Sequence, residues 1–198
     1  MPAMIRLLVA ASVLFLVGTS AEAAPKKKYH FELTAVTAKP DVKADVAKSA
    51  TPRVETQVKK AFESHAQLVA KLDGAPPLPE KPTPQQMDAY RAFLKKKGLG
   101  GAYWVTVEVT EASEELVPTD KPNTQRLVVH VAVHVLGEQI PGKTMGFTGD
   151  GQATIKQEVG KKVRDKDREF AWDSAAEVAI ADAMQTVFKQ LAIPPKKQ

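Results

Sequence analysis

Alternating apolar and polar residues predict four β-strands in this chain. The strands cover residues 29–36, 102–111, 126–136 and 143–157. Successive side chains of a strand point to opposite faces, so a period of two indicates a sheet with one buried face. The second and third segments are rich in valine, whose branched side chain suits a pleated surface. Three glycines weaken the last segment, and we expect a bulge or an irregular middle there. They are Gly146, Gly149 and Gly151.

Apolar residues three and four positions apart predict a long amphipathic helix in the first half of the chain. We expect it to begin at Thr51 and Pro52, which suit an N-cap and a first helical position, and to end at Gly74. A separate short helix is expected over residues 41–49. Residues 75–82 contain four prolines and must form a loop, because proline lacks the amide hydrogen that helices and sheets use.

Start and stop signals predict two further helices. Thr83, followed three residues later by Gln86, matches a capping box, and Gly98 supplies the stop. Lysines in the last turn of this helix lie at the negative end of the helix dipole, where positive charge is favourable. The closing helix is predicted to run from near Trp172 to Leu191, where apolar residues again follow a helical spacing.

The order of the elements is strand, helix, helix, three strands and helix, which predicts an α+β fold. We expect a four-stranded, largely antiparallel sheet with the helices packed on one face. The last three strands should form a meander, and the first strand should lie beside one of them. Residues 29–191 are expected to make a single domain, and residues 192–198 a flexible tail.

The first residues have the pattern of a secretory signal peptide. A short basic start is followed by an apolar run over residues 7–17 and by small residues at Ala21 and Ala23. Such a run rises only about 16 Å as a helix, which is too short to cross a membrane stably. We therefore expect removal of residues 1–23, a basic lead-in over 24–28, and a periplasmic or secreted protein without a stable transmembrane anchor.

Composition narrows the range of partners. The chain has no cysteine, so an exported form has neither disulfides nor the lipid-bearing thiol of a bacterial lipoprotein. The leader contains one arginine and one glutamate, so the net charge is +5 with or without it. This mild excess favours anionic partners only weakly. Nucleic acid is not expected as a partner, because the sequence lacks base-reading motifs and interleaved aromatic residues.

Two charged stretches oppose each other. Residues 108–120 contain five acidic and no basic residues, whereas residues 161–168 contain five basic and two acidic ones. In an antiparallel meander the loop over 112–124 and the connector over 158–169 would leave the sheet at the same end. One interpretation is a solvated surface whose charges neutralise each other, since surface ion pairs typically contribute about 0–1 kcal/mol. The other is that the basic residues contact an acidic partner or an anionic cell-surface polymer. These residues are Lys161, Lys162, Arg164, Lys166 and Arg168.

The residues that could support catalysis or metal binding favour structural roles. His130 and His134 lie four apart on a predicted strand, about 13 Å from each other, so they cannot share one ion. The acidic pairs at 114–115 and 165–167 lie in polar stretches where a raised pKa is hard to achieve. Residues 146–151 are rich in glycine, but a strand, not a helix N-terminus, is predicted to follow them. The serines lack a nucleophile motif.

Two segments resemble a small α+β domain of bacterial envelope proteins. In residues 93–109 a helix ends in lysines and glycine before an alternating Tyr-Trp-Val-Thr-Val strand, and residues 175–191 form an alanine-rich closing helix. The layout is similar to that of the amino-terminal domain of the Tol system's propeller protein, the curli-secretion channel protein and the lipoprotein activators of penicillin-binding proteins. In those families the domain docks partners or builds assemblies and does not catalyse. The resemblance implies such a role here, but it transfers no partner-contacting residue.

These features predict an exported, non-catalytic envelope protein that acts by binding, as an adaptor or an accessory subunit of an assembly. The adaptor hypothesis predicts an exposed strand edge or apolar patch. A binding module for anionic glycans or lipids is the alternative, favoured if the basic connector is isolated from the acidic loop. An enzyme is the third, which a deep pocket with convergent ionisable groups would favour. No cofactor is expected, and the sequence does not determine the oligomeric state.

Overall fold

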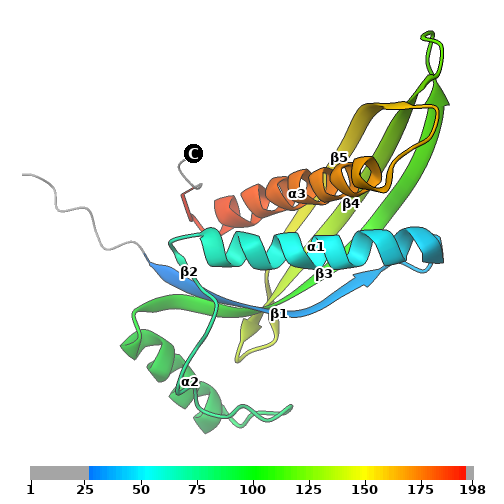
Figure 1. Ribbon diagram of the computed structural model, residues 1–198. Coiled ribbons are helices and arrows are strands. Elements are labelled where there is room, and N and C mark those ends of the chain that lie inside the picture. The colour runs from blue at the N-terminus through cyan, green and yellow to red at the C-terminus, as the bar shows by residue number, and fades with distance from the viewer. Residues whose placement is uncertain (1–26, 195–198) are drawn as a thin grey trace, which may run out of the picture.

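The computed structural model describes residues 27–194 (Figure 1). In chain order the elements are β1 (Lys28–Ala38), α1 (Ala44–Ser64), β2 (Leu68–Val69), α2 (Pro84–Lys96), β3 (Leu99–Pro118), β4 (Thr124–Ile140), β5 (Thr144–Gly160) and α3 (Asp165–Gln190). The expected leader over 1–23 and residues 24–26 of the basic lead-in lie outside the described residues, so they stay predictions. Residues 195–198 of the expected tail also lie outside them.

The strands form a five-stranded mixed sheet in the order β2-β1-β3-β4-β5. β3, β4 and β5 make an antiparallel meander, and β1 lies beside β3, as expected. The α+β class is therefore confirmed. The expectation of four largely antiparallel strands is wrong, because β2 is a fifth strand and β1 runs parallel to both β2 and β3. The chain between β1 and β3 contains two helices, and a parallel pair requires such a long crossover.

The first helix differs from its prediction at both ends. α1 begins at Ala44 and passes through Pro52, so the predicted short helix and long helix are one element. Pro52 lacks the amide hydrogen that would donate to the Lys48 oxygen. In the same turn the Arg53 side chain adds a hydrogen bond to the helix, because its Nη1 donates to the Ser49 oxygen at 2.7 Å. The helix ends at Ser64 and does not reach the predicted stop at Gly74.

Long-range hydrogen bonds explain why α1 ends early. His65 is extended and residues 66–67 form a turn, and the backbone amide of Tyr29 donates to the Gln67 oxygen at 2.8 Å. The Gln67 side-chain amide donates to the Lys27 oxygen at 2.9 Å. These bonds to the start of β1 draw residues 68 and 69 into the sheet as β2. The helical spacing of Leu68 in the sequence favoured a helix. Sequence periodicity contains no information on bonds to residues so distant in the chain.

The capping box of α2 is confirmed in detail. The Thr83 hydroxyl accepts from the Gln86 amide at 3.3 Å, and the Gln86 side-chain oxygen accepts from the Thr83 amide at 2.8 Å. At the other end Gly98 has φ +70°, a conformation that glycine adopts without strain. Local signals therefore suffice to place this helix.

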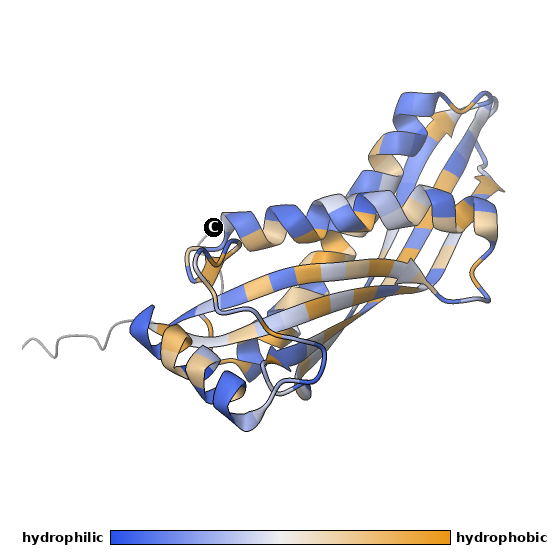
Figure 2. Ribbon diagram, turned by 90° about the horizontal axis from the view of Figure 1, so that it is seen from below, coloured by the Kyte–Doolittle hydropathy of each residue, from blue (hydrophilic) through white to orange (hydrophobic). Residues whose placement is uncertain are grey.

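Helices cover both faces of the sheet. α1 and α3 pack on one face and share a core with β1, β3, β4 and β5. α2 packs at one end of the opposite face, where Tyr90 and Leu94 contact Ala102 and Ile140 (Figure 1). The prediction of helices on one face is therefore right for α1 and α3 but wrong for α2, because apolar residues also occur on the other face at this end. Figure 2 shows hydrophobic and hydrophilic residues alternating along the strands.

Glycines in β5 allow α3 to lie directly on the sheet. A Cβ atom at Gly149 would lie 2.5 Å from the backbone oxygen of Ala183, and one at Gly151 would overlap the backbone oxygen of Ala179. The expected bulge falls at Gly146, where the register between β4 and β5 shifts, whereas the other two glycines pair regularly. The buried face of α3 is made largely of small residues. They include Ala171, Ala175, Ala176, Ala179 and Ala183.

The last helix begins earlier than predicted, and the chain after it is packed against the core. α3 begins at Asp165 and not near Trp172, because acidic residues in the predicted connector suit the first turn of a helix. β5 continues to Gly160, so the predicted connector over 158–169 is reduced to residues 161–164. Ile193 falls in the stretch expected to be a flexible tail. It is buried, and its amide donates to the Phe188 oxygen at 2.8 Å.

The contact between α3 and β5 predicts a strong effect of one methyl group. Gly151→Ala should lower the free energy of unfolding by about 1–3 kcal/mol, because the added Cβ would push the helix off the sheet. Gly160→Ala is the matched control in the same strand, since its nearest neighbouring atom lies 4.0 Å from an added Cβ. Urea unfolding followed by circular dichroism measures both. Equal stability of the two variants would contradict the proposed role of the glycine.

Candidate binding site at the open end of the sheet

The sheet extends beyond β1 at one end, and this leaves one edge of β3 open. Pairing between β1 and β3 stops at Ala38 and Val109, whereas pairing between β3 and β4 continues to Pro118 and Gln125. Over residues 110–118 β3 therefore has β4 on one side and, within the described part of the chain, no strand on the other (Figure 1). We call this stretch the free edge of β3.

The free edge corrects the predicted loop over 112–124, which is reduced to a turn over 119–123. Residues 110–118 contain three glutamates and only one valine, Val117. Glutamate is not enriched in strands, so local propensity disfavours a strand here. Pairing with β4 provides the hydrogen bonds that hold the segment extended. The weak alternation of polar and apolar residues over 111–116 was the signal in the sequence.

A groove of about 300 Å³ lies beside the free edge. One wall is formed by residues 110–115 of β3, and the other by residues 41–46 at the start of α1. Val42, Val46 and Ala112 are its apolar lining. Its charged lining has one basic residue, Lys43, against several acidic ones. The acidic residues are Asp41, Glu111, Glu114 and Glu115.

A bulge in β3 decides which acidic side chains face the solvent. The register with β4 shifts between Val109 and Glu111. Beyond this shift Glu111 and Glu115 share the face of the sheet that lies away from α3, and both are exposed. Glu111 Oε2 lies 3.5 Å from His130 Nε2 on β4. Glu114 has the opposite parity and points toward α3.

Glu114 of β3 accepts hydrogen bonds from the first turns of α3 and so connects this helix to the sheet. Its Oε1 accepts from Arg168 Nε at 2.6 Å, and its Oε2 accepts from the indole nitrogen of Trp172 at 2.8 Å. The Glu114 side chain is only 22% exposed, and Trp172 is buried. A charged, hydrogen-bonded pair in such a position is stronger than one in water. Arg168, expected to contact an anionic partner, is therefore engaged within the chain.

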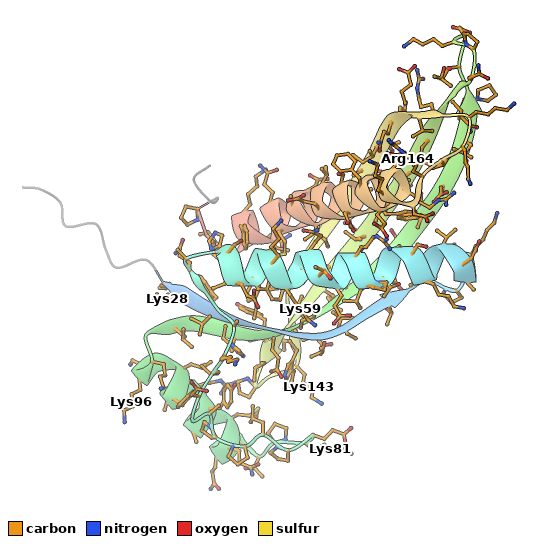
Figure 3. All side chains as sticks on the ribbon, in the orientation of Figure 1. Lys28, Lys59, Lys81, Lys96, Lys143 and Arg164 are labelled. Carbon is orange, nitrogen blue, oxygen red and sulfur yellow. The ribbon has the colours of Figure 1, made fainter. Side chains whose placement is uncertain are left out.

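Arg164 is also engaged within the chain. Its Nε and Nη2 donate to the two carboxylate oxygens of Asp167 at 2.7 and 2.8 Å. These hydrogen bonds hold the pKa of the Asp167 carboxyl below its ordinary value of 3.8. The same bonds raise the pKa of the Arg164 guanidinium. In Figure 3 Arg164 lies at the end of the molecule where β3, β4 and β5 project.

The three remaining basic residues of the predicted site stay exposed. Lys161, Lys162 and Lys166 have no carboxylate within 4.0 Å among the residues that the structure describes. The acidic and basic stretches do lie at the same end of the sheet, as expected. Lys121 Nζ lies 2.8 Å from Glu158 across this end. The structure thus pairs two of the five predicted residues and leaves three to solvent.

Part of the outer edge of β5 is bonded by side chains of α3, in contrast to the free edge of β3. The backbone amide of Thr148 donates to Gln190 Oε1 at 3.2 Å, and Gln190 Nε2 donates to the Thr148 oxygen at 2.8 Å. Asp182 Oδ2 accepts from the backbone amide of Gln152 at 3.4 Å. Side chains of α3 thus take the place of a further strand along this part of β5.

The histidines have structural partners. His134 Nδ1 lies 2.7 Å from Asp150 Oδ1, and His130 Nδ1 lies 3.0 Å from Thr154 Oγ1. Within residues 27–194 no cluster of three or more histidine and acidic side chains is placed to hold a metal ion. No helix in the same residues is both long and apolar enough to span a membrane.

A larger groove, of about 750 Å³, lies between α1 and α3. Ala61, Val178, Met184 and Phe188 contribute its apolar lining. Lys60 and Glu177, which form an ion pair at 3.3 Å, also line it. The other ionisable side chains of the lining, His65 and Asp182, contact backbone groups: His65 Nε2 lies 3.2 Å from the Pro194 oxygen, and Asp182 Oδ2 accepts from the Gln152 amide.

No protein-family model and no curated protein matches the sequence. Several solved structures match in fold. A homologue of the neuraminyllactose-binding haemagglutinin from Helicobacter pylori is 9% identical over 83% of this chain and 86% of that one, with a TM-score of 0.44. A minor lipoprotein from Acinetobacter baumannii is 10% identical over 82% and 97%, with a TM-score of 0.38. Rare lipoprotein B from Shewanella oneidensis is 11% identical over 81% and 96%, with a TM-score of 0.37.

These likenesses concern the fold alone. With identities of 9–11% and TM-scores below 0.5, they carry no argument about function. None of the three proteins belongs to the Tol, curli or penicillin-binding-protein systems by its name. The resemblance to the domain of those systems therefore stays a prediction.

The pair of Arg164 and Asp167 predicts a pH-dependent contribution to stability. Because the folded pKa of Asp167 is lowered, the pair stabilises the fold above pH 3.8, and this contribution is lost as the pH falls through the folded value. Asp167→Asn should therefore be less stable than the wild type at neutral pH, and the difference should shrink in acid. Asp165→Asn, in the same helical turn, is the control for the helix dipole. Denaturant unfolding at a series of pH values gives both differences. A difference for Asp167→Asn that stays constant into acid would contradict this role.

Proposed function

We propose that this is an exported, non-catalytic envelope protein that acts by binding another protein, as an adaptor or accessory subunit of an assembly. The observation that carries the proposal is the free edge of β3, which projects beyond β1 at the open end of the sheet. Strand edges with unpaired backbone groups are ready templates for association. The signal-peptide pattern in residues 1–23 supports placement in the envelope or outside the cell.

Exposed apolar residues at the same end support this proposal. Leu116 and Val117 are 45% and 40% exposed, at the end of the free edge. They lie on opposite faces of the strand, so apolar surface surrounds the edge on both sides. Single exposed apolar residues are common, but two of them beside an unpaired edge form a surface that a partner can bury.

In-cell crosslinking tests the proposed adaptor role. A photoreactive benzoylphenylalanine at Val117 should capture a specific envelope protein, whereas the same residue at Lys96 should not. Lys96 is exposed on α2, at the other end of the molecule (Figure 3). Mass spectrometry of the captured product identifies the partner. Capture at neither position, or equal capture at both, would count against a binding role for this end of the sheet.

A second candidate function is binding of anionic glycans or lipids. The observation in its favour is that Lys161, Lys162 and Lys166 remain exposed, without an ion pair among the described residues. Three unpaired ammonium groups near each other attract polyanions, and the attraction weakens with salt. Against it stands the acidic character of the neighbouring free edge.

Retention on immobilised lipopolysaccharide or cell-wall polymer separates the two candidates. If the lysines bind polyanions, the triple change of Lys161, Lys162 and Lys166 to glutamine abolishes retention at low salt. The control changes Lys95, Lys96 and Lys97 to glutamine, which removes the same charge from α2 and its C-cap. Equal retention of both triple variants and the wild type would exclude the anionic-polymer role and leave the adaptor proposal.

A further inference from the structure

The geometry of the free edge points to one class of partner, and this inference rests on the proposed adaptor function. We propose that β3 binds an extended segment of a partner protein by strand addition, and that the segment alternates basic residues with apolar ones. The added strand would continue the line of β1 beyond Ala38 and lie in the groove between β3 and residues 41–46.

The backbone of the free edge supplies the hydrogen bonds. The last bond on this side of β3 comes from the Lys39 amide, which donates to the Val109 oxygen at 3.0 Å. From residue 110 to 118, no hydrogen bond from another described segment reaches this side. In a strand about every second residue presents its amide and carbonyl to a given side, so about four residues of the free edge can pair with an incoming strand.

The side chains on the face of β3 that lies away from α3 favour a positively charged partner. Glu111 and Glu115 lie on this face and are exposed, and Asp41 adds a third carboxylate at the groove. Directly opposed residues of adjacent strands have Cβ atoms about 4.5–5.5 Å apart, close enough for opposite charges to attract. Lysine or arginine at alternate positions of the partner segment would therefore lie against Glu111 and Glu115.

The side chains on the face of β3 toward α1 and α3 favour apolar residues in the partner segment. Ala112 and Leu116 point to this face, and Val42 and Val46 of the opposite wall lie across the groove. Glu114 points to the same face, but its carboxylate is bound by Arg168 and Trp172. Because the groove has a volume of only about 300 Å³, small or β-branched side chains fit it better than aromatic ones. The two faces together specify an alternation of basic and apolar residues, since successive side chains of an extended peptide point in opposite directions.

The same acidic residues disfavour a second copy of this chain as the occupant. Two free edges placed against each other would bring the acidic side chains of one copy close to those of the other, and like charges on adjacent strands are destabilising. Charged residues on edge strands commonly prevent such self-pairing. A strand with basic side chains is attracted to this edge, whereas an acidic strand is repelled. We therefore assign the free edge to a basic partner segment.

Peptide binding to the processed full chain tests the inference. The probe is an eight-residue peptide of alternating lysine and valine. It should slow amide hydrogen exchange within residues 110–117 in NMR spectra, since Pro118 has no amide hydrogen. Two derivatives N-methylated on alternate residues, at the lysines or at the valines, separate backbone pairing from charge. The version that blocks the pairing side should lose binding, and a glutamate–valine peptide should not bind. Equal binding of both methylated versions, or protection elsewhere in the chain, would overturn strand addition.

A charge variant tests the selection of basic residues. The double change Glu111→Gln and Glu115→Gln should raise the dissociation constant of the lysine–valine peptide about threefold to tenfold, as expected for the loss of two exposed ion pairs. Glu63→Gln with Glu80→Gln removes the same charge from exposed positions outside the groove and is the control. An equal effect of the two double variants, or no effect of either, would overturn the proposed charge selection.

The outcomes separate this inference from the adaptor proposal. If a photoreactive residue at Val117 captures an envelope protein but the peptide does not protect the amides of residues 110–117, strand addition is wrong and the adaptor role stands. If the peptide binds at the free edge but nothing is captured in cells, the adaptor role is wrong although the edge can accept a strand.

Discussion

The close contact between α3 and β5 is the constraint on which the rest of the structure depends. Glycines at positions 149 and 151 let the alanine face of the helix lie against the strand backbone. This contact fixes the helix along β5, so that Gln190 and Asp182 reach the backbone of the strand edge. Near its N-terminus the same helix is joined to β3 by the side chains of Arg168 and Trp172, which donate hydrogen bonds to Glu114.

This arrangement treats the two sides of the sheet differently. On one side, helix side chains satisfy part of the β5 edge and protect it from pairing. On the other side, β1 ends at Ala38 and the chain turns into α1. Over nine residues, 110–118, β3 therefore pairs with β4 but has no strand on its β1 side. The free edge of β3 thus carries exposed acidic side chains and unpaired backbone groups, whereas on β5 the backbone of Thr148 and Gln152 is bonded by side chains of α3.

The charged stretches illustrate how a tertiary structure changes the interpretation of a sequence. Opposed acidic and basic stretches favoured either mutual neutralisation or an anionic partner, and the structure divides the basic residues between these interpretations. Arg164 and Arg168 are held by Asp167 and Glu114, whereas the three lysines remain exposed. The acidic residues divide in the same way, because the bulge after Val109 turns Glu114 inward and leaves Glu111 outside.

The sequence by itself determined the elements whose signals are local: the valine-rich strands of the meander, the capping box of α2 and the charge of the chain. Only the tertiary structure decided the parallel pairing of β1, the short β2, the passage of α1 through Pro52 and the extension of β3 to Pro118. The reason is physical. Side-chain periodicity and caps act within a few residues, whereas these features depend on hydrogen bonds and packing between segments far apart in the chain. The candidate site belongs to the second group, because an edge is free only by virtue of where its neighbouring strand ends.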